Sequence, residues 1–341
     1  MKILENVLYI LTENSYLHCD NGTISVKIGG SEKVRIPAHT VESIICLCNT
    51  TVSSPFIGFC GENGISLSFH SDNGKFYGRI YGPVNGNVLL RKKQYQYIDS
   101  PESIDIVRNV LRGKFLNSRN LLQKSARGTI DDKADILRNA AQIITGQAEL
   151  LEKSESIDNM RGIEGVVASV YFQAFDTMLK VDENEMKFIK RSRRPPENRV
   201  NALLSFTYML LKNDMQSALE SVGLDPAAGY LHTLRPGRPS LALDIIKELR
   251  SPLCDRFVIS ILNLKQIKSK DFEVGNGVYK LSDDARRLII KEWQQRKKEI
   301  ITHPFLKEKI PIGLIPYCQS MLLARYIRGD IDEYPPFIWR Y

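Results

Sequence analysis

The stretch YLHCDNGTISV, residues 16–26, places a turn between two short apolar runs. Its centre is Asn21-Gly22, and both residue types tolerate the positive φ angles that a two-residue hairpin turn requires. Short apolar runs divided by turn residues extend outward from about residue 6 to residue 81. This pattern predicts a β-rich N-terminal domain in which residues 16–26 form a hairpin.

One short helix is expected within this domain. Ser53-Ser54-Pro55 supplies an N-cap and a first-turn proline. Gly61 and Gly64 then close the segment before a strand over residues 65–69.

The pattern changes after Gly82-Pro83 and Gly86, where long stretches with helical spacing replace the short runs. We therefore predict an α+β protein with a β-rich domain over residues 1–83 and a larger all-α domain over residues 84–341. The expected helices of the second domain begin at Ser100-Pro101-Glu102 and cover residues 131–153, 165–180, 201–212, 241–249, 253–264, 282–300 and 316–328.

The composition narrows the class of protein. A length of 341 residues suits two domains, and the 43% hydrophobic and 25% charged shares are typical of a globular chain. Lys+Arg of 47 against Asp+Glu of 39 gives a net charge of +8, which favours nucleic acid as a partner. The alternative is a protein that this charge merely keeps in solution.

The six cysteines show no CxxC pair and no zinc-like spacing, so we expect reduced core residues. No segment reaches the roughly 18 apolar residues that a membrane-spanning helix needs. The sequence therefore predicts a cytoplasmic protein without a membrane partner.

Glu164 is the first candidate for a chemical role. It stands between Gly162 and Gly165, at the expected start of a helix. A carboxylate there can simply complement the positive end of the helix dipole. The glycines also leave room for a ligand or a nucleic-acid backbone, as a metal-binding carboxylate requires. Both interpretations stay open at this point.

His232 is the second candidate. It precedes a helix on which Asp244, Lys247 and Glu248 share one face by their spacing. A lone histidine before a helix is more often a structural hydrogen-bonding residue, but these carboxylates and nearby arginines could converge with it. Nitrogen and carboxylate ligands without thiolate suit Mg²⁺ or Mn²⁺. Beside basic residues, such a site favours phosphodiester cleavage or transfer.

Basic residues that could bind phosphate occur in a run over residues 190–199 and again just after His232. Guanidinium groups bind phosphate oxygens in a two-point geometry. The run could also be a targeting signal. The candidate DNA-binding residues are Arg191, Arg193, Arg194, Arg235 and Arg238.

Taken together, these segments resemble the CRISPR-associated integrase, protein one of the machinery that adds spacers to a CRISPR array. The resemblance spans almost the whole chain and rests on the order and spacing of its motifs. They are Arg161-Gly162-Ile163-Glu164-Gly165, Arg193-Arg194-Pro195-Pro196, Gly229-Tyr230-Leu231-His232, Arg238-Pro239-Ser240-Leu241-Ala242-Leu243-Asp244 and Tyr334-Pro335-Pro336-Phe337.

This resemblance implies a β domain used for dimerisation and an α-helical catalytic domain, arranged as an asymmetric homodimer. Two dimers would flank a dimer of CRISPR-associated protein two. The family's reaction is attack of a spacer 3′-hydroxyl on a phosphodiester of the CRISPR repeat, and the family also shows metal-dependent nuclease activity. By position, Glu164 and His232 match its glutamate and histidine ligands for Mg²⁺ or Mn²⁺.

Lys247 departs from the family pattern, which usually has an acidic ligand at this position. An ammonium group cannot ligate a cation and repels it. We expect Glu164, His232 and Asp244 to act as catalytic residues and metal ligands, with Glu248 as an assisting ligand. The alternatives are a catalytically weakened relative that binds DNA and a partner as a scaffold, and a general metal-dependent nuclease.

Overall fold

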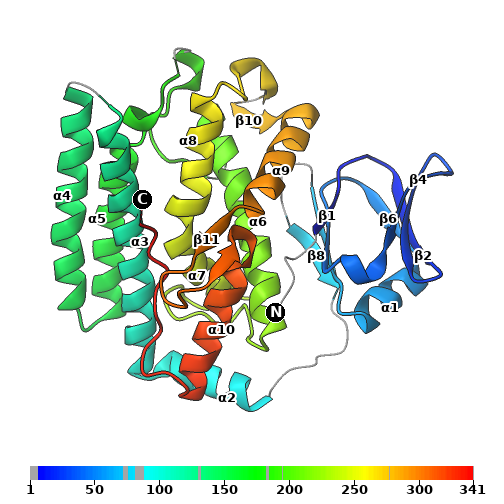
Figure 1. Ribbon diagram of the computed structural model, residues 1–341, viewed down its shortest axis with the longest axis horizontal. Helices are drawn as coiled ribbons and strands as arrows, with labels where there is room; N and C mark the ends of the chain where they lie inside the picture. Colours follow the sequence, from blue (N-terminus) through cyan, green and yellow to red (C-terminus); the bar gives the residue numbers. More distant parts are fainter. Residues whose placement is uncertain are drawn as a thin grey trace. The chain divides into compact units, whose positions relative to one another are not determined.

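A computed structural model describes residues 7–71, 76–80, 88–129, 132–181, 184–193, 195–275 and 277–340. The chain forms two compact units (Figure 1). The first consists of Met1–Asn85 with Arg286–Lys298, and the second of Gly86–Ala285 with Glu299–Tyr341. The predicted boundary at Gly82-Pro83 and Gly86 lies outside the described residues.

The first unit contains two four-stranded sheets. One has the order β1 (Val7–Ile10), β5 (Ser43–Cys46), β7 (Ser66–His70), β8 (Phe76–Ile80). The other has the order β4 (Ser31–Pro37), β3 (Thr23–Ile28), β2 (Ser15–Asp20), β6 (Thr50–Val52). Asp20 pairs with Thr23, and the two turn residues between them have φ angles of 46° and 73°. The predicted hairpin is confirmed.

Apolar side chains from both sheets form one buried core, and Leu17, Ile24 and Ile44 are fully buried in it. Helix α1 (Ser54–Glu62) packs into the same core through Phe56. The Ser53 hydroxyl accepts a hydrogen bond from the Phe56 backbone N–H at 3.3 Å, so the predicted N-cap is confirmed.

Most of helix α9 (Asp283–Lys297) belongs to the first unit, although in sequence it lies between the two segments of the second. Its Trp293 is only 3% exposed. The sequence did not predict this return, because an amphipathic pattern shows that a helix has a buried face without showing which core that face covers.

The second unit is mainly helical, as predicted. Its helices are α2 (Val88–Gln96), α3 (Glu102–Arg127), α4 (Asp132–Glu152), α5 (Ile157–Gln173), α6 (Arg199–Ser221), α7 (Ser240–Leu249), α8 (Arg256–Asn263) and α10 (Ile315–Arg328). Two small hairpins, which were not predicted, accompany them. They are β9 (Phe272–Gly275) with β10 (Val278–Leu281), and β11 (Ile300–Thr302) with β12 (Lys309–Pro311).

Helix α5 begins eight residues before the predicted start at residue 165, so Glu164 lies within the helix and not at its N-terminus. The two glycines of this segment suggested a helix boundary. Tertiary packing overrides their low helix propensity. Met160, Val167 and Tyr171 recur at helical spacing and are buried.

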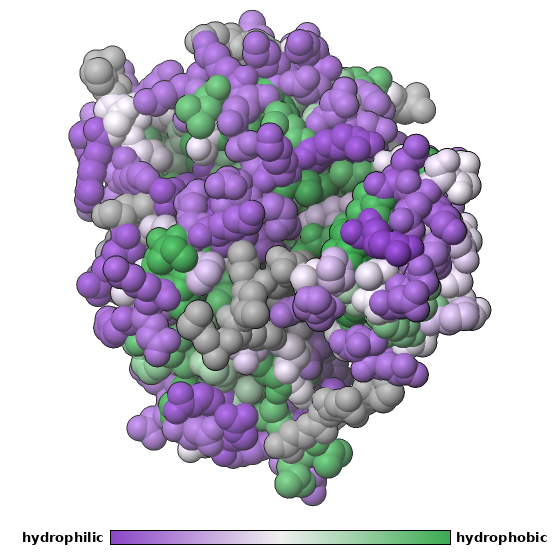
Figure 2. Space-filling view, turned by 45° about the vertical axis from the view of Figure 1, so that its right-hand side comes forward, coloured by the Kyte–Doolittle hydropathy of each residue, from purple (hydrophilic) through white to green (hydrophobic). Residues whose placement is uncertain are grey.

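A π-helical segment, Arg250–Asp255, joins α7 to α8. Pro252 lies in it and has no backbone N–H to donate, which favours a local change of hydrogen-bond register. None of the described helices is long and apolar enough to cross a bilayer. The face shown in Figure 2 is largely hydrophilic, with hydrophobic side chains in small separate groups.

Candidate active site

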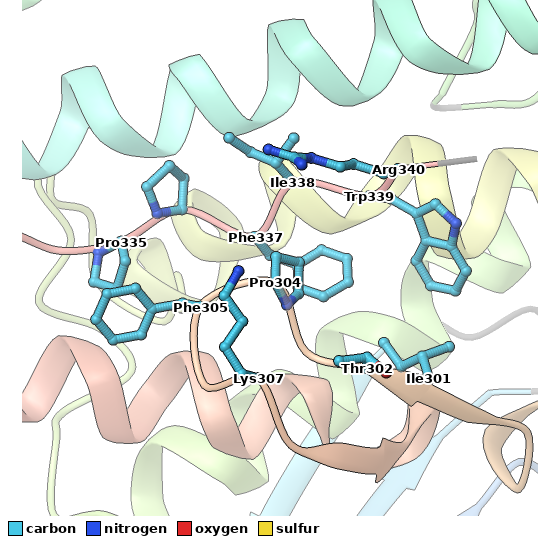
Figure 3. Close-up of a pocket in the computed structure, with 11 residues that line it drawn as sticks. Ile301, Thr302, Pro304, Phe305, Lys307, Pro335, Phe337, Ile338, Trp339 and Arg340 are labelled. Atoms are coloured by element: carbon cyan, nitrogen blue, oxygen red, sulfur yellow. The ribbon is translucent and has the colours of Figure 1, made fainter.

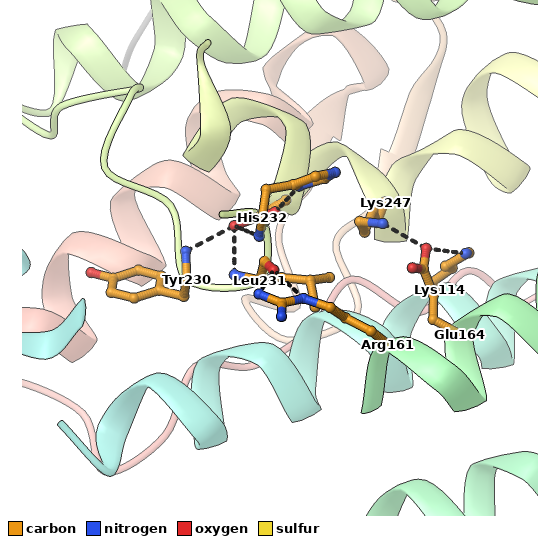
Figure 4. A network of polar contacts seen from close by, with 8 residues as sticks. Lys114, Arg161, Glu164, Tyr230, Leu231, His232 and Lys247 are labelled. Carbon is orange, nitrogen blue, oxygen red and sulfur yellow. Dashed lines mark hydrogen bonds and ion pairs between the residues drawn. The ribbon is translucent and has the colours of Figure 1, made fainter. Parts of the chain in front are cut away.

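Glu164 on α5 is clamped between two ammonium groups (Figure 4). Its Oε1 lies 2.6 Å from Lys114 Nζ of α3 and 2.5 Å from Lys247 Nζ of α7. The Lys247 side chain is 7% exposed and the Glu164 side chain 20%. Lys247 is therefore part of the site itself and does not swing out into solvent.

The charges of this cluster keep Glu164 ionised. Burial alone would raise the pKa of Glu164, but Lys114 and Lys247 outweigh it and hold the pKa well below its usual range. Burial, reinforced by repulsion from Lys114, lowers the pKa of Lys247 to about 8 even though Glu164 opposes the shift. The Glu164 carboxylate is therefore shared between two buried lysine amino groups, and Lys247, with a pKa of about 8, is mostly protonated at neutral pH.

His232 is held by Asp244, which is 2% exposed. The imidazole Nδ1 forms a short hydrogen bond with Asp244 Oδ1. The same carboxylate accepts hydrogen bonds from the backbone N–H groups of Tyr230 and Leu231, each at 2.9 Å, and of His232 at 3.2 Å. A carboxylate on one ring nitrogen fixes the orientation of the ring and leaves Nε2 for a ligand, an arrangement common behind metal-bound histidines.

Arg161 joins the His232 loop to α5. It lies one turn before Glu164 and donates from Nε at 2.8 Å and from Nη2 at 2.6 Å to the Leu231 carbonyl. Helix α5 therefore positions both halves of the site. The sequence motif containing Arg161 was recognised, but its contact with a loop 70 residues away was not predicted.

Gly229 allows this loop to approach α7 closely. A Cβ at this position would lie 2.6 Å from the Ser240 carbonyl carbon and 2.7 Å from Asp244 Oδ2. Both distances are shorter than van der Waals contact, so only glycine fits without a shift of backbone.

Glu248 lies in a different environment from the one expected. It is fully buried and accepts hydrogen bonds from Tyr334 Oη at 2.5 Å, Gln319 Nε2 at 2.9 Å and the Phe337 backbone N–H at 3.0 Å. Burial raises the pKa of Glu248 to about 8, although these donors oppose the shift. The role of Glu248 as an assisting metal ligand stays a prediction, and in this structure both of its oxygens are engaged by Tyr334, Gln319 and the Phe337 N–H.

The residues present do not complete the predicted ligand set for Mg²⁺ or Mn²⁺. Within the described part of the chain, no group of three or more His, Cys, Asp or Glu side chains could hold a metal ion. Glu164 and His232 offer two donors. Asp244, the expected third ligand, uses both oxygens on the loop and the imidazole, and Lys247 contributes an amino group that cannot ligate a cation.

The predicted DNA-binding arginines differ in their surroundings. Arg191 bonds Asn201 Oδ1 at 2.8 Å and lies 5.3 Å from the centre of the Tyr208 ring, so its contacts are structural. Arg193 and Arg235 are exposed, Arg238 is half-buried, and Arg194 lies outside the described residues.

Arg250 is a basic residue of the site that sequence reasoning missed. It lies at the start of the π-helical segment, 4.9 Å from the centre of the Tyr208 ring. Burial lowers the pKa of Lys114, and the charges of Arg250 and Arg193 add to this effect. Both guanidinium groups therefore belong to the positive surroundings of Glu164.

Comparison with known proteins places these motifs in context. The family model described as CRISPR associated protein Cas1 matches residues 8–295. The chain is 44% identical over 344 residues to the CRISPR-associated endonuclease Cas1 1 of Chlorobaculum tepidum, with all of both chains covered. It is 43% identical over 349 residues to the CRISPR-associated endonuclease Cas1 2 of Rhodospirillum rubrum, again with complete coverage of both.

Solved structures share the fold. The Cas1 protein TM1797 from Thermotoga maritima has a TM-score of 0.81 at 24% identity, covering 95% of this chain and 97% of that one. A casposase bound to its integration product has a TM-score of 0.80 at 20% identity, covering 96% and 92%.

Proposed function

Because the chain belongs to the Cas1 family of CRISPR-associated endonucleases, we propose that it binds DNA in spacer acquisition with a strand-joining activity that Lys247 weakens. The observation that carries this proposal is the pair of ammonium groups within 2.6 Å of Glu164 Oε1. They occupy the side of the carboxylate that a divalent cation needs.

The chemistry of the site supports DNA binding more than the joining of DNA strands. Lys114, Lys247, Arg193 and Arg250 form a positive region that attracts phosphate, and ammonium and guanidinium groups both bind phosphate oxygens. An ammonium group cannot coordinate a hydroxyl oxygen. It therefore cannot lower the pKa of the attacking hydroxyl as a bound metal ion does. The Nε2 atom of His232 is placed to take part in general acid–base catalysis, but such catalysis supplies only part of the rate enhancement that strand joining needs.

A second candidate is a fully active, Mg²⁺- or Mn²⁺-dependent integrase. The buried Asp244 behind His232 favours it, because this pair matches the support that metal-bound histidines receive. An active integrase requires the Lys247 ammonium group to move from Glu164 to a DNA phosphate when DNA binds.

For partners, we propose a homodimer that assembles with a Cas2-type protein. Support comes from a structure named Cas6-RT-Cas1--Cas2 complex, to which this chain is similar over its full length with a TM-score of 0.84, although it spans only 36% of that chain. Light scattering on the purified chain, alone and mixed with the Cas2-type protein of the same genome, tests this assembly. A chain that stays monomeric and elutes separately from that protein would contradict it.

A strand-transfer assay separates the two candidates. Labelled spacer DNA and a repeat target would be incubated with Mn²⁺ and with wild type, Lys247→Glu, Lys247→Met or His232→Ala. We expect wild type to join DNA only slightly better than His232→Ala. Lys247→Glu should restore joining, because it adds a carboxylate ligand, whereas Lys247→Met removes the ammonium group without adding one.

The level of joining in each variant distinguishes the two candidate functions. Joining by wild type well above His232→Ala supports the active integrase and contradicts weakening. Equal joining by Lys247→Glu and Lys247→Met would show that charge alone matters, not ligation. Wild-type binding to DNA should persist in chelator and fall as salt rises, because phosphate contacts release counterions.

A further inference from the structure

The C-terminal tail, residues 334–340, borders two hollows that share Ile338 and Arg340. The first, the tail cavity, has a volume of about 530 Å³, within the range of small-ligand pockets. It is lined by Ile301, Thr302, Pro304, Phe305, Lys307 and residues 335–340 (Figure 3). The second, the α3 groove, has a volume of about 340 Å³ and is lined by Leu116, Arg119, Asn120, Gln123, Lys124 and Arg127.

The tail is held rigidly although it contains no helix or strand. Asn117 of α3 donates to the Phe337 carbonyl and accepts from the Trp339 N–H, each at 2.7 Å. Asn120 donates to the Trp339 carbonyl at 2.8 Å, and Glu248 accepts from the Phe337 N–H. Each of these hydrogen bonds joins a side chain of α3 or α7 to the backbone of the tail. The tail backbone is therefore fixed, and it presents its own side chains in fixed positions.

The opposite wall of the tail cavity is also preorganised. His303 Nδ1 accepts from the backbone N–H groups of Phe305 at 3.3 Å and Leu306 at 3.2 Å, and its Nε2 meets Gln319 Oε1 at 3.1 Å. This pattern places the imidazole proton on Nε2 and fixes the loop. Phe305 nevertheless remains 48% exposed, which is unusual for a large aromatic ring on a rigid loop.

Aromatic rings lie at both ends of this cavity. In Figure 3, Phe305 stands at one end of the lining and the Trp339 indole at the other. Arg256 lies 5.2 Å from the centre of the Trp339 ring and supports it from α8. Rings held in this way can stack with the flat face of a nucleobase.

All charged residues that line the two hollows are basic: Arg119, Lys124, Arg127, Lys307 and Arg340. The sequence of α3 has no acidic residue after Asp105. At about 100° per residue, Arg119 and Arg127 each lie about 140° around the helix from Lys114. The α3 groove is therefore separate from the Glu164 site on the other side of the helix.

We propose that the tail cavity and the α3 groove together form a second nucleic-acid site that takes a single-stranded segment. One base would stack on Phe305 at one end of the cavity and another on Trp339 at the other, and the adjoining phosphates would lie on Arg340, Arg119 and Arg127. A single strand fits because its bases can leave the stack and expose their faces, whereas those of a duplex cannot. An acidic peptide matches the charge but not the aromatic cavity. This proposal rests on the proposed function, since it assumes a DNA substrate.

The test uses the full chain with Trp293→Phe, which leaves Trp339 as the sole tryptophan. An eight-nucleotide oligothymidylate should quench Trp339 fluorescence on stacking. Phe305→Ala should weaken this binding roughly 5- to 150-fold, the usual effect of losing one base stack. An abasic oligomer of equal length should bind weakly and show no difference between Phe305 and Phe305→Ala.

The salt dependence of oligonucleotide affinity tests the α3 groove separately. Arg119→Gln and Arg127→Gln should each lower the slope of log affinity against log salt by about 0.7, the value for one phosphate contact on a single strand. Matched controls are Arg138→Gln, exposed on α4, and Ile189→Ala, which removes an apolar side chain that is 83% exposed. Neither should change the quenching.

Three results would overturn the proposal: no quenching by oligothymidylate, equal quenching by the abasic oligomer, or equal quenching by an oligoglutamate peptide of the same charge. The last would identify a peptide-docking surface instead. Because quenching requires no joining, failure here leaves the Lys247→Glu assay unaffected. Quenching together with no gain of joining in Lys247→Glu would in turn contradict only the proposed function.

Discussion

Replacing Glu248 with glutamine should remove a large part of the pH dependence of stability. Burial raises the pKa of this carboxyl to about 8 from an ordinary value of 4.5. A raised folded-state pKa means that the folded chain holds the proton more tightly than the unfolded chain. The stability this group contributes is therefore complete below pH 4.5 and is lost as the pH rises through 8.

The size of the effect follows from linkage. One pKa unit corresponds to about 1.4 kcal/mol, so raising the pH from 5 to 8 should lower the wild-type free energy of unfolding by about 3.5 kcal/mol through this group. Glutamine stays neutral throughout and lacks this loss. Its amide group would face the Phe337 N–H, which costs about 1–3 kcal/mol at every pH. The variant should thus be less stable at pH 5 and approach or exceed wild type above pH 8.

Urea unfolding at pH 5, 6, 7, 8 and 9 checks this, with Trp339 fluorescence as the probe in a Trp293→Phe background. Trp339 is suitable because it lies on the segment that Glu248 anchors. Glu149→Gln, exposed on α4, is the matched control and should follow wild type. If wild type and Glu248→Gln give parallel profiles from pH 5 to 8, the carboxyl is not protonated in the folded chain and the reasoning is refuted.

Three more substitutions test the active site. Gly229→Ala should lower the unfolding free energy by several kcal/mol, because its Cβ would lie 2.7 Å from an Asp244 oxygen; an unchanged melting temperature would contradict this. Glu164→Gln should cost about 3 kcal/mol at pH 7, since it leaves two lysines without a carboxylate. The depressed pKa of Glu164 makes wild type's advantage complete above pH 4.5 and lost only as the pH falls through the low folded-state pKa, so chemical denaturation should give a smaller difference at pH 3 than at pH 7 without abolishing it. Arg161→Lys should weaken the hold on the His232 loop by about 1 kcal/mol, seen as roughly fivefold faster amide exchange there; unchanged exchange would argue against this contact.

Local signals in the sequence were sufficient for much of the fold. The Asn21-Gly22 turn and the Ser53 cap depend on residues a few positions apart, and both form as predicted. The start of α5 was misplaced because Gly162 suggested a boundary that packing against distant helices overrides. Long-range packing of this kind leaves little trace in a local pattern.

The site was predictable as a set of residues but not as a geometry. Spacing on a helix put Asp244, Lys247 and Glu248 on one broad face, yet each has a different partner. Glu248 bonds the chain's C-terminal segment, more than 80 residues away in sequence. Only tertiary structure could separate a carboxylate that supports His232 from one that anchors the tail.

The clamp of Lys247 on Glu164 also bears on how such a chain evolves. Every lysine codon becomes a glutamate codon by one base change in its first position. A site filled by its own ammonium group is therefore a single point mutation away from one that presents a carboxylate. A glutamate at this position is available to selection in one step, for as long as Arg161 and Asp244 keep the rest of the site in place.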